Sequence, residues 1–265
     1  MNCHIYVDGS WLFKQCGKQK SLSWRAFPKS KHEKIFFIDY SKLINLIINE
    51  LRSTIKEDLD VGTLWYFSSV FSELTEIPGE DVQLILRENY AKKRIIDEVR
   101  KAGFNTDHVF EVPFKPWMID AIKSKSYKEK KVDSAMVTYM ADNFKNYEND
   151  YHAVVTGDLD VMPAIQRLMQ SGIGKVILVT TKPHQWDITM QQTSWELANY
   201  PFSHGPIFLE DKVKSIMSGD LIYECVRCRD LFARRKAIPP LSQPLCIKCY
   251  TEKTILNYRM DQAKA

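Results

Sequence analysis

The chain has 265 residues and a mass of 30.9 kDa, and 45% of its residues are hydrophobic and 12% aromatic. This composition excludes a disordered or fibrous chain and suffices for one large and one small folded domain. The first residues lack the basic and apolar segments of a signal peptide, and no apolar run reaches the roughly 18 residues of a membrane span. We therefore expect a cytoplasmic protein that does not enter a membrane.

The formal net charge of +4 is unevenly distributed. Residues 221–265 hold 9 Lys and Arg against 4 Asp and Glu, which gives +5, whereas residues 1–220 carry −1. One Zn²⁺ bound by four thiolates would add about −2 to the tail and leave it basic. A basic tail on a nearly neutral body predicts an anionic partner, most simply nucleic acid.

Strand and helix patterns alternate along residues 4–209. Short β-branched and aromatic runs predict strands at 4–7, 61–70, 109–112, 153–155, 176–179 and 207–209. Helical spacing of apolar residues, with start and stop signals, predicts helices that begin near 11 and 132 and others at 39–51, 81–102, 161–169 and 187–197. The alternation predicts an α/β fold with a mostly parallel sheet covered by helices on both faces.

Four aspartates fall where this fold would bring them to one edge of the sheet. Asp8 follows the first strand, Asp158 and Asp160 follow the strand at 153–155, and Asp133 lies in the first turn of a helix. Strand ends and helix starts share an edge in such sheets, and converging carboxylates repel one another unless a divalent cation neutralises them. The alternative is that Asp133 and Asp160 are ordinary helix N-caps.

Two segments are rich in basic residues. Residues 17–34 form a basic and aromatic excursion that is either a solvated insertion or a nucleic-acid groove. Residues 115–131 carry six lysines, of which Lys128, Lys130 and Lys131 lead directly to Asp133. We expect these three to follow a phosphate backbone, although such loops are more often simply solvated.

The acidic motifs resemble those of the NYN-domain nucleases, relatives of the PIN nucleases. The resemblance rests on Ile5 to Ser10, Lys131 to Asp133, and Val155 to Asp160 with Pro163, and it covers roughly residues 3–210. It implies a Rossmann-like, PIN-like fold and cleavage of RNA with Mg²⁺ or Mn²⁺ as cofactor. The residues that it implies as metal-binding and catalytic are Asp8, Asp133, Asp158 and Asp160, with Ser10 as a further catalytic residue.

Two positions depart from the family pattern. Ser10 stands where the family often has Asn, and it reaches less far with its single hydroxyl. Tyr139 stands where a second acid often follows Asp133, and Asp142 is one turn later. Both departures favour the alternative of a fold that binds nucleic acid without cutting it.

Four cysteines form two C-x-x-C pairs near the C-terminus, at Cys225, Cys228, Cys246 and Cys249. This spacing is typical of a closed structural Zn²⁺ site and is similar to that of zinc ribbons. Basic residues surround it, and we expect nucleic-acid contacts from Arg227, Arg229, Arg234 and Arg235. The alternative is a protein partner or a homodimer docked through the ribbon. The predicted domains are residues 1–212, the nuclease-like domain, and 213–265, the zinc ribbon with a helical tail.

The sequence therefore predicts a metal-dependent endoribonuclease that acts on RNA without a side-chain nucleophile, and it leaves open whether DNA is a second substrate. One alternative is a non-catalytic adaptor that binds nucleic acid. Another is a phosphatase of the haloacid dehalogenase type, which needs an aspartate where this chain has Ser10.

Overall fold

The structure is a computed structural model of the chain. It describes residues 1–17, 22, 33–72, 80–123, 131–170, 175–183, 195–202, 204–228, 231–234, 236, 238–239 and 241–262.

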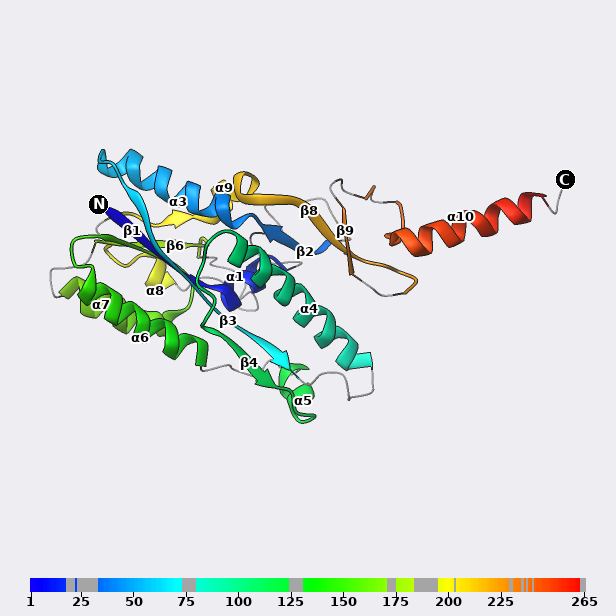
Figure 1. The fold of residues 1–265 in the computed structure, drawn as a ribbon, viewed down its shortest axis with the longest axis horizontal. Coiled ribbons are helices and arrows are strands. Elements are labelled where there is room, and N and C mark those ends of the chain that lie inside the picture. Colours follow the sequence, from blue (N-terminus) through cyan, green and yellow to red (C-terminus); the bar gives the residue numbers. More distant parts are fainter. Residues whose placement is uncertain are drawn as a thin grey trace.

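A six-stranded parallel sheet forms the centre of the molecule (Figure 1). Its strands, in spatial order, are β4 (Val109–Pro113), β3 (Asp60–Ser72), β1 (Asn2–Asp8), β5 (Tyr151–Val155), β6 (Lys175–Thr180) and β7 (Ile207–Phe208). All six predicted strands are thereby confirmed. The chain moves outward from β1 through β3 to β4, then returns to the other side of β1 and moves outward again. The direction of winding therefore reverses between β1 and β5, which is where doubly wound sheets bind ligands.

Helices cover both faces of this sheet because its strands alternate their side chains. Cys3, Ile5 and Val7 pack on one face, while Tyr6 between them packs on the other. The first face is covered by α1 (Gly9–Gln15), α3 (Tyr40–Ile55), α4 (Glu80–Lys101) and α9 (Leu209–Ile216). The second face is covered by α6 (Lys131–Asn146), α7 (Met162–Gln170) and the short α8 (Trp195–Ala198). The predicted helix at 187–197 is described only from Trp195 onward.

Local signals set the ends of the helices. Asp39 caps α3 by accepting the backbone N–H of Lys42, and Lys56 ends that helix in the left-handed conformation at φ 56°. At the start of α1, a Cβ on Gly9 would overlap the Tyr66 ring, so this position requires glycine. The close approach of Tyr66 to Gly9 fixes the position of α1, which begins directly after Asp8.

A second, antiparallel sheet joins distant parts of the chain. Its order is β2 (Glu33–Ile38), β8 (Met217–Glu224) and β9 (Leu231–Arg234), and the sequence patterns did not predict any of these strands. The predicted C-terminal domain, residues 213–265, is called the C-terminal module below. Its sheet thus includes a strand from outside these bounds. Most of the predicted excursion at 17–34 lies outside the described residues.

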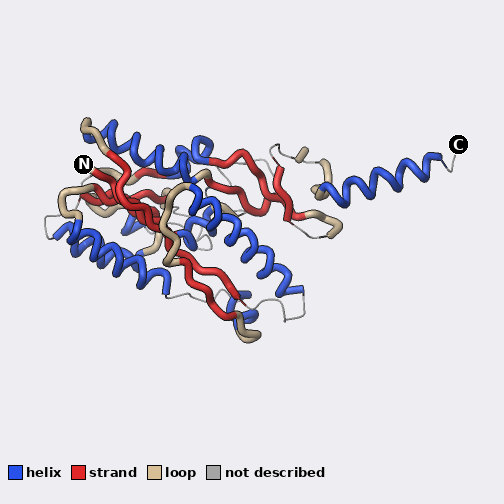
Figure 2. The backbone as a smooth tube through the Cα atoms, in the orientation of Figure 1, coloured by secondary structure: helices blue, strands red, loops and turns tan. Residues whose placement is uncertain are grey.

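The remaining helices lie toward the edges of the molecule. The short α5 (Met118–Lys123) packs near the start of α4 through Phe114, Met118 and Ile85. The predicted C-terminal helix is α10 (Ile247–Gln262), which points away from the central sheet (Figures 1 and 2). Within the described residues, no helix is both long and apolar enough to cross a membrane.

Candidate metal centre and cysteine cluster

Three of the four predicted acids come together at the carboxyl edge of the parallel sheet. Asp133, Asp158 and Asp160 each place a carboxylate oxygen within 4.8 Å of the other two. Asp133 lies in the first turn of α6, as predicted, and the other two follow β5. They meet beside the β1–β5 reversal, where the alternating pattern predicted them.

Asp8 lies beside this triad at the end of β1 and is only 3% exposed. One of its carboxylate oxygens accepts the backbone N–H of Trp11 at 2.9 Å, so Asp8 caps α1. The other accepts the hydroxyl of Thr156 at 3.0 Å. Asp8 therefore contributes its charge to the site from a fixed, buried position.

Hydrogen bonds connect the acids through the loop after β5. The Thr156 oxygen accepts the N–H of Asp158 at 3.1 Å, and Asp158 accepts the N–H of Asp160 at 3.1 Å. Asp158 thus caps the 3₁₀ turn η2 (Leu159–Val161), and the interpretation of Asp160 as the cap is wrong. Thr156 is a site residue that was not predicted, because its only signal in the sequence is its place directly after a buried strand.

The grouping of negative charge changes the pKa of two acids. Burial, and then the charges of Asp8, Asp158 and Asp160, raise the pKa of Asp133 to about 7. Burial raises the pKa of Asp8 to about 6, although the bonds from Trp11 and Thr156 oppose the change. The site is therefore strained when all its carboxylates are ionised, as expected of a site that receives a cation.

Lys14 is a residue near the acids that was not predicted from the sequence. The charge of Lys14, an exposed residue of α1, lowers the pKa of both Asp8 and Asp133. It lies near the acids because α1 is a short helix that begins directly after its cap, Asp8. No pattern in the sequence distinguished it from the other N-terminal lysines.

The two departures from the family pattern occupy different surroundings. The Ser10 hydroxyl lies 3.4 Å from the hydroxyl of Ser68 on β3. The Tyr139 ring packs on His108, with 3.8 Å between ring centroids. Asp142 is exposed further along α6 and is not a member of the acidic triad.

The predicted nucleic-acid contacts are only partly described. Lys131 is exposed at the start of α6, whereas Lys128 and Lys130 lie outside the described residues. In the C-terminal module, Arg234 is exposed and Arg227 forms an ion pair of 3.0 Å with Glu252. Arg229 and Arg235 also lie outside the described residues.

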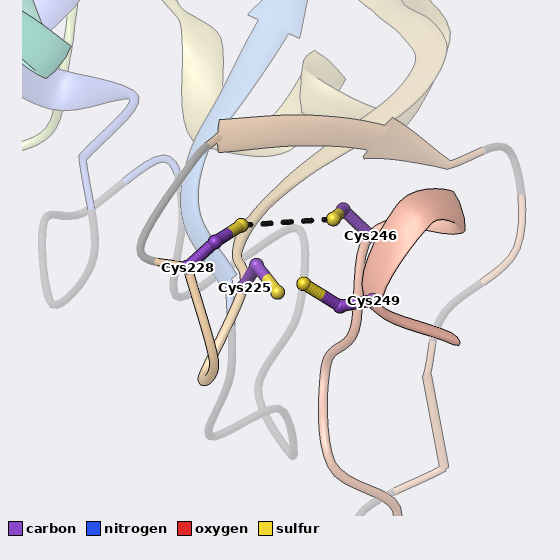
Figure 3. A group of neighbouring side chains, drawn as sticks. All are labelled: Cys225, Cys228, Cys246 and Cys249. Atoms are coloured by element: carbon purple, nitrogen blue, oxygen red, sulfur yellow. Dashed lines mark hydrogen bonds between the residues drawn. The ribbon is translucent and has the colours of Figure 1, made fainter. Parts of the chain in front are cut away.

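The four predicted cysteines form one cluster. Their sulfur atoms lie within 4.8 Å of one another and point toward a common centre (Figure 3). Cys225 and Cys228 come from the turn after β8, while Cys246 and Cys249 lie at the start of α10. All four are free thiols, so the arrangement is that of a metal site and can bind an ion.

The backbone around Cys225 favours a thiolate. Burial opposes ionisation, but the N–H groups of Cys228, Cys246 and Arg227 together lower the pKa of Cys225 to about 6. By contrast, burial raises the pKa of Cys3 to about 12, as expected for a thiol inside the core. Within the cluster, burial also raises the pKa of Cys249, so the backbone favours the thiolate at Cys225 in particular.

A cavity of about 360 Å³ lies away from both clusters. It lies between α3, β6, β7 and α9 and includes Glu50, His204 and Lys212. Among the described residues, no predicted site residue lines it, and the acidic triad is the better candidate site because its charges converge.

Comparisons with known proteins do not place the chain in a family. No family profile matches it, and no curated protein is detectably similar in sequence. The crystal structure of a protein of unknown function from Vibrio parahaemolyticus is similar with a TM-score of 0.42 and 13% identity. That similarity covers 82% of this chain and 96% of the other, and it is too weak to support an argument.

Proposed function

We propose that the chain is a metal-dependent endoribonuclease of the NYN type, with a C-terminal zinc ribbon. The observation that carries the proposal is the convergence of Asp133, Asp158 and Asp160 beside the buried Asp8 at the reversal of the sheet. Burial and the charges of the other three acids raise the pKa of Asp133, and a bound cation would offset both the loss of solvation and the repulsion.

The acidic triad fits a small divalent cation. Octahedral Mg²⁺ with ligands at about 2.1 Å separates its oxygens by about 3 Å or, for opposite ligands, about 4 Å. The three carboxylates offer oxygens that already lie within 4.8 Å of one another, which is close to this range. Bound Mg²⁺ or Mn²⁺ would polarise the phosphodiester and lower the pKa of the attacking water.

The protein's own residues position the substrate and the acids. Thr156 holds Asp8 and the backbone of Asp158 in one hydrogen-bonded chain, which fixes the spacing between β1 and the loop after β5. Lys14 and Lys131 are exposed near the acids and would attract the phosphate backbone. No nucleophilic side chain is needed.

The cysteine cluster fits Zn²⁺. Tetrahedral Zn²⁺ with Zn–S bonds of about 2.3 Å separates its sulfurs by about 3.8 Å. The sulfur atoms of Cys228 and Cys246 are 3.7 Å apart. All four positions would be filled by protein, so this site stabilises the module and does not catalyse.

The adaptor alternative has one observation in its favour. Tyr139, at the place of a family acid, is engaged with His108, so the site has fewer acids than the family pattern. The phosphatase alternative has less support, because Asp8 would have to attack as a nucleophile. Both of its oxygens accept hydrogen bonds and it is almost fully buried.

The test is cleavage of a panel of single-stranded and structured RNAs with Mn²⁺ or Mg²⁺. We expect Asp158→Asn to reduce cleavage at least about a hundredfold, because one charged ligand of the cation is lost. Asp142→Asn, on α6 but outside the triad, is the matched control and should cleave normally. If the wild type binds RNA but never cuts it, the adaptor function replaces the proposal. Cutting of DNA in the same assay would widen the substrate class.

A further inference from the structure

An aromatic cluster lies where α6 packs against β3 and β4. Trp65 and Phe67 come from β3, His108 precedes β4, and Tyr139 comes from α6. The Tyr139 ring centroid lies 3.8 Å from that of His108, 5.3 Å from that of Trp65 and 6.2 Å from that of Phe67. Three separate segments therefore contribute to one aromatic surface.

Two members of the cluster, Phe67 and His108, lie level with Asp8 across the sheet. Phe67 is the register partner of Asp8, and His108 comes directly before the residue paired with Ser68. Two strand spacings of about 4.8 Å separate β1 from β4, which places His108 about 10 Å from Asp8. The helical rise likewise places Tyr139 about 9 Å along α6 from Asp133. This distance spans about three stacked nucleotides, at about 3.4 Å each.

The cluster does not have the properties of a closed core. The Tyr139 side chain remains 36% exposed, and Trp65 is only half-buried. His108 is 9% exposed, yet among the residues that the structure describes neither its Nε2 atom nor the buried indole Nε1–H of Trp65 has a hydrogen-bond partner. Buried polar atoms of a purely structural cluster are normally paired, so these two indicate a site that a ligand or water completes.

We propose that this cluster binds an unpaired nucleobase of a single-stranded RNA, stacked on Tyr139, whose scissile phosphate lies at the acidic triad. The inference rests on the proposed function and specifies its substrate as single-stranded at this position. Aromatic rings accept any base face, and a base can stack only when it is not paired. Burial also lowers the pKa of His108, which keeps its ring uncharged beside Tyr139.

The test measures the binding of short single-stranded RNA in the Asp158→Asn background without divalent cation, so that no RNA is cut. We expect Tyr139→Leu, which keeps apolar volume over His108 but removes the aromatic face, to weaken binding about tenfold. Tyr139→Phe should bind within about twofold of the parent. Tyr90→Leu is the matched control, because Tyr90 is an exposed tyrosine of α4, and it should bind like the parent.

A second arm replaces the protein change with a change in the RNA. An oligonucleotide with abasic positions should bind the parent as weakly as intact RNA binds the Tyr139→Leu protein. This arm needs no substitution at Tyr139, so it holds even if that variant fails to fold. Equal binding of intact and abasic RNA, in a protein that still cleaves RNA when Asp158 is present, would overturn the inference alone. Absence of both binding and cleavage would overturn the proposed function with it.

Discussion

The acidic triad and the cysteine cluster relate to the fold in opposite ways. The triad lies at the ends of a fully packed parallel sheet. The hydrophobic core stabilises this sheet without help from the triad and holds its carboxylates together although they repel one another. The cysteine cluster has little core of its own, since Leu221, Tyr223 and Ile238 are the fully buried apolar side chains described between β8 and β9 and the loop that follows. The packed sheet thus positions the acids of the triad. In the C-terminal module, by contrast, we expect metal binding by the four cysteines to hold the fold together.

The largest expected difference between the two regions is in how much structure each loses when metal is removed. Chelation, or Cys246→Ser, should release about one equivalent of Zn²⁺ and unfold the module, because structural Zn²⁺ contributes about 10 kcal/mol or more to such folds. Hydrogen exchange should show lost protection in β8, β9 and the start of α10, and retained protection in the parallel sheet. Cys3→Ala is the control, since Cys3 is buried in the parallel sheet and is not a member of the cluster. Unchanged exchange in the module after complete zinc loss would contradict the comparison.

A smaller effect should appear when metal binding is measured against pH. The pKa of Asp133 is raised to about 7, so below that pH the carboxyl group must release a proton before it binds a cation. Calorimetric titration with Mn²⁺ should show affinity that is constant above pH 8 and falls about tenfold per unit below pH 7. An affinity that is flat from pH 8 to pH 6 would show that Asp133 is ionised throughout that range.

The smallest effect concerns the stability of the metal-free fold. Because burial and neighbouring charges raise the folded-state pKa of Asp133 from 3.8 to about 7, its ionisation destabilises the fold fully above pH 7, and this destabilisation declines steadily as the pH falls below 7. At pH 8, Asp133→Asn should therefore raise the melting temperature by about 2–4 °C, after allowance for its partial exposure. It should also remove most of the stabilisation by Mn²⁺. Asp142→Asn should change neither the melting temperature nor the stabilisation by Mn²⁺. A lower melting temperature for Asp133→Asn would contradict the claim that ionised Asp133 destabilises the metal-free fold.

The parallel sheet could be predicted because its signals are local. Each strand has a short apolar run, and alternation with helices then places Asp8, Asp133 and Asp158 at one edge. The cysteine spacing is equally local and predicted the cluster. The cap on η2 was not predictable, because the sequence offers Asp158 and Asp160 at nearly equivalent positions and only backbone geometry selects between them.

Long-range features escaped prediction. Nothing near residues 33–38 indicates that β2 will pair with β8, since the run Ile35 to Ile38 resembles any short buried strand. The position of Lys14 and the packing of Tyr139 on His108 likewise depend on contacts between elements that are far apart in the sequence.

The pairing of β2 with β8 also orders events during synthesis of the chain. β2 ends at Ile38, and its partner is not complete until Glu224 has been made. By then every residue of the acidic triad has left the ribosome, and the β1–β5 pair can already have formed. The last strands and the cysteines are therefore added to a chain that already contains every residue of the acidic site. A chain that stops short of Glu224 leaves β2 as an unpaired edge, which exposes it to aggregation.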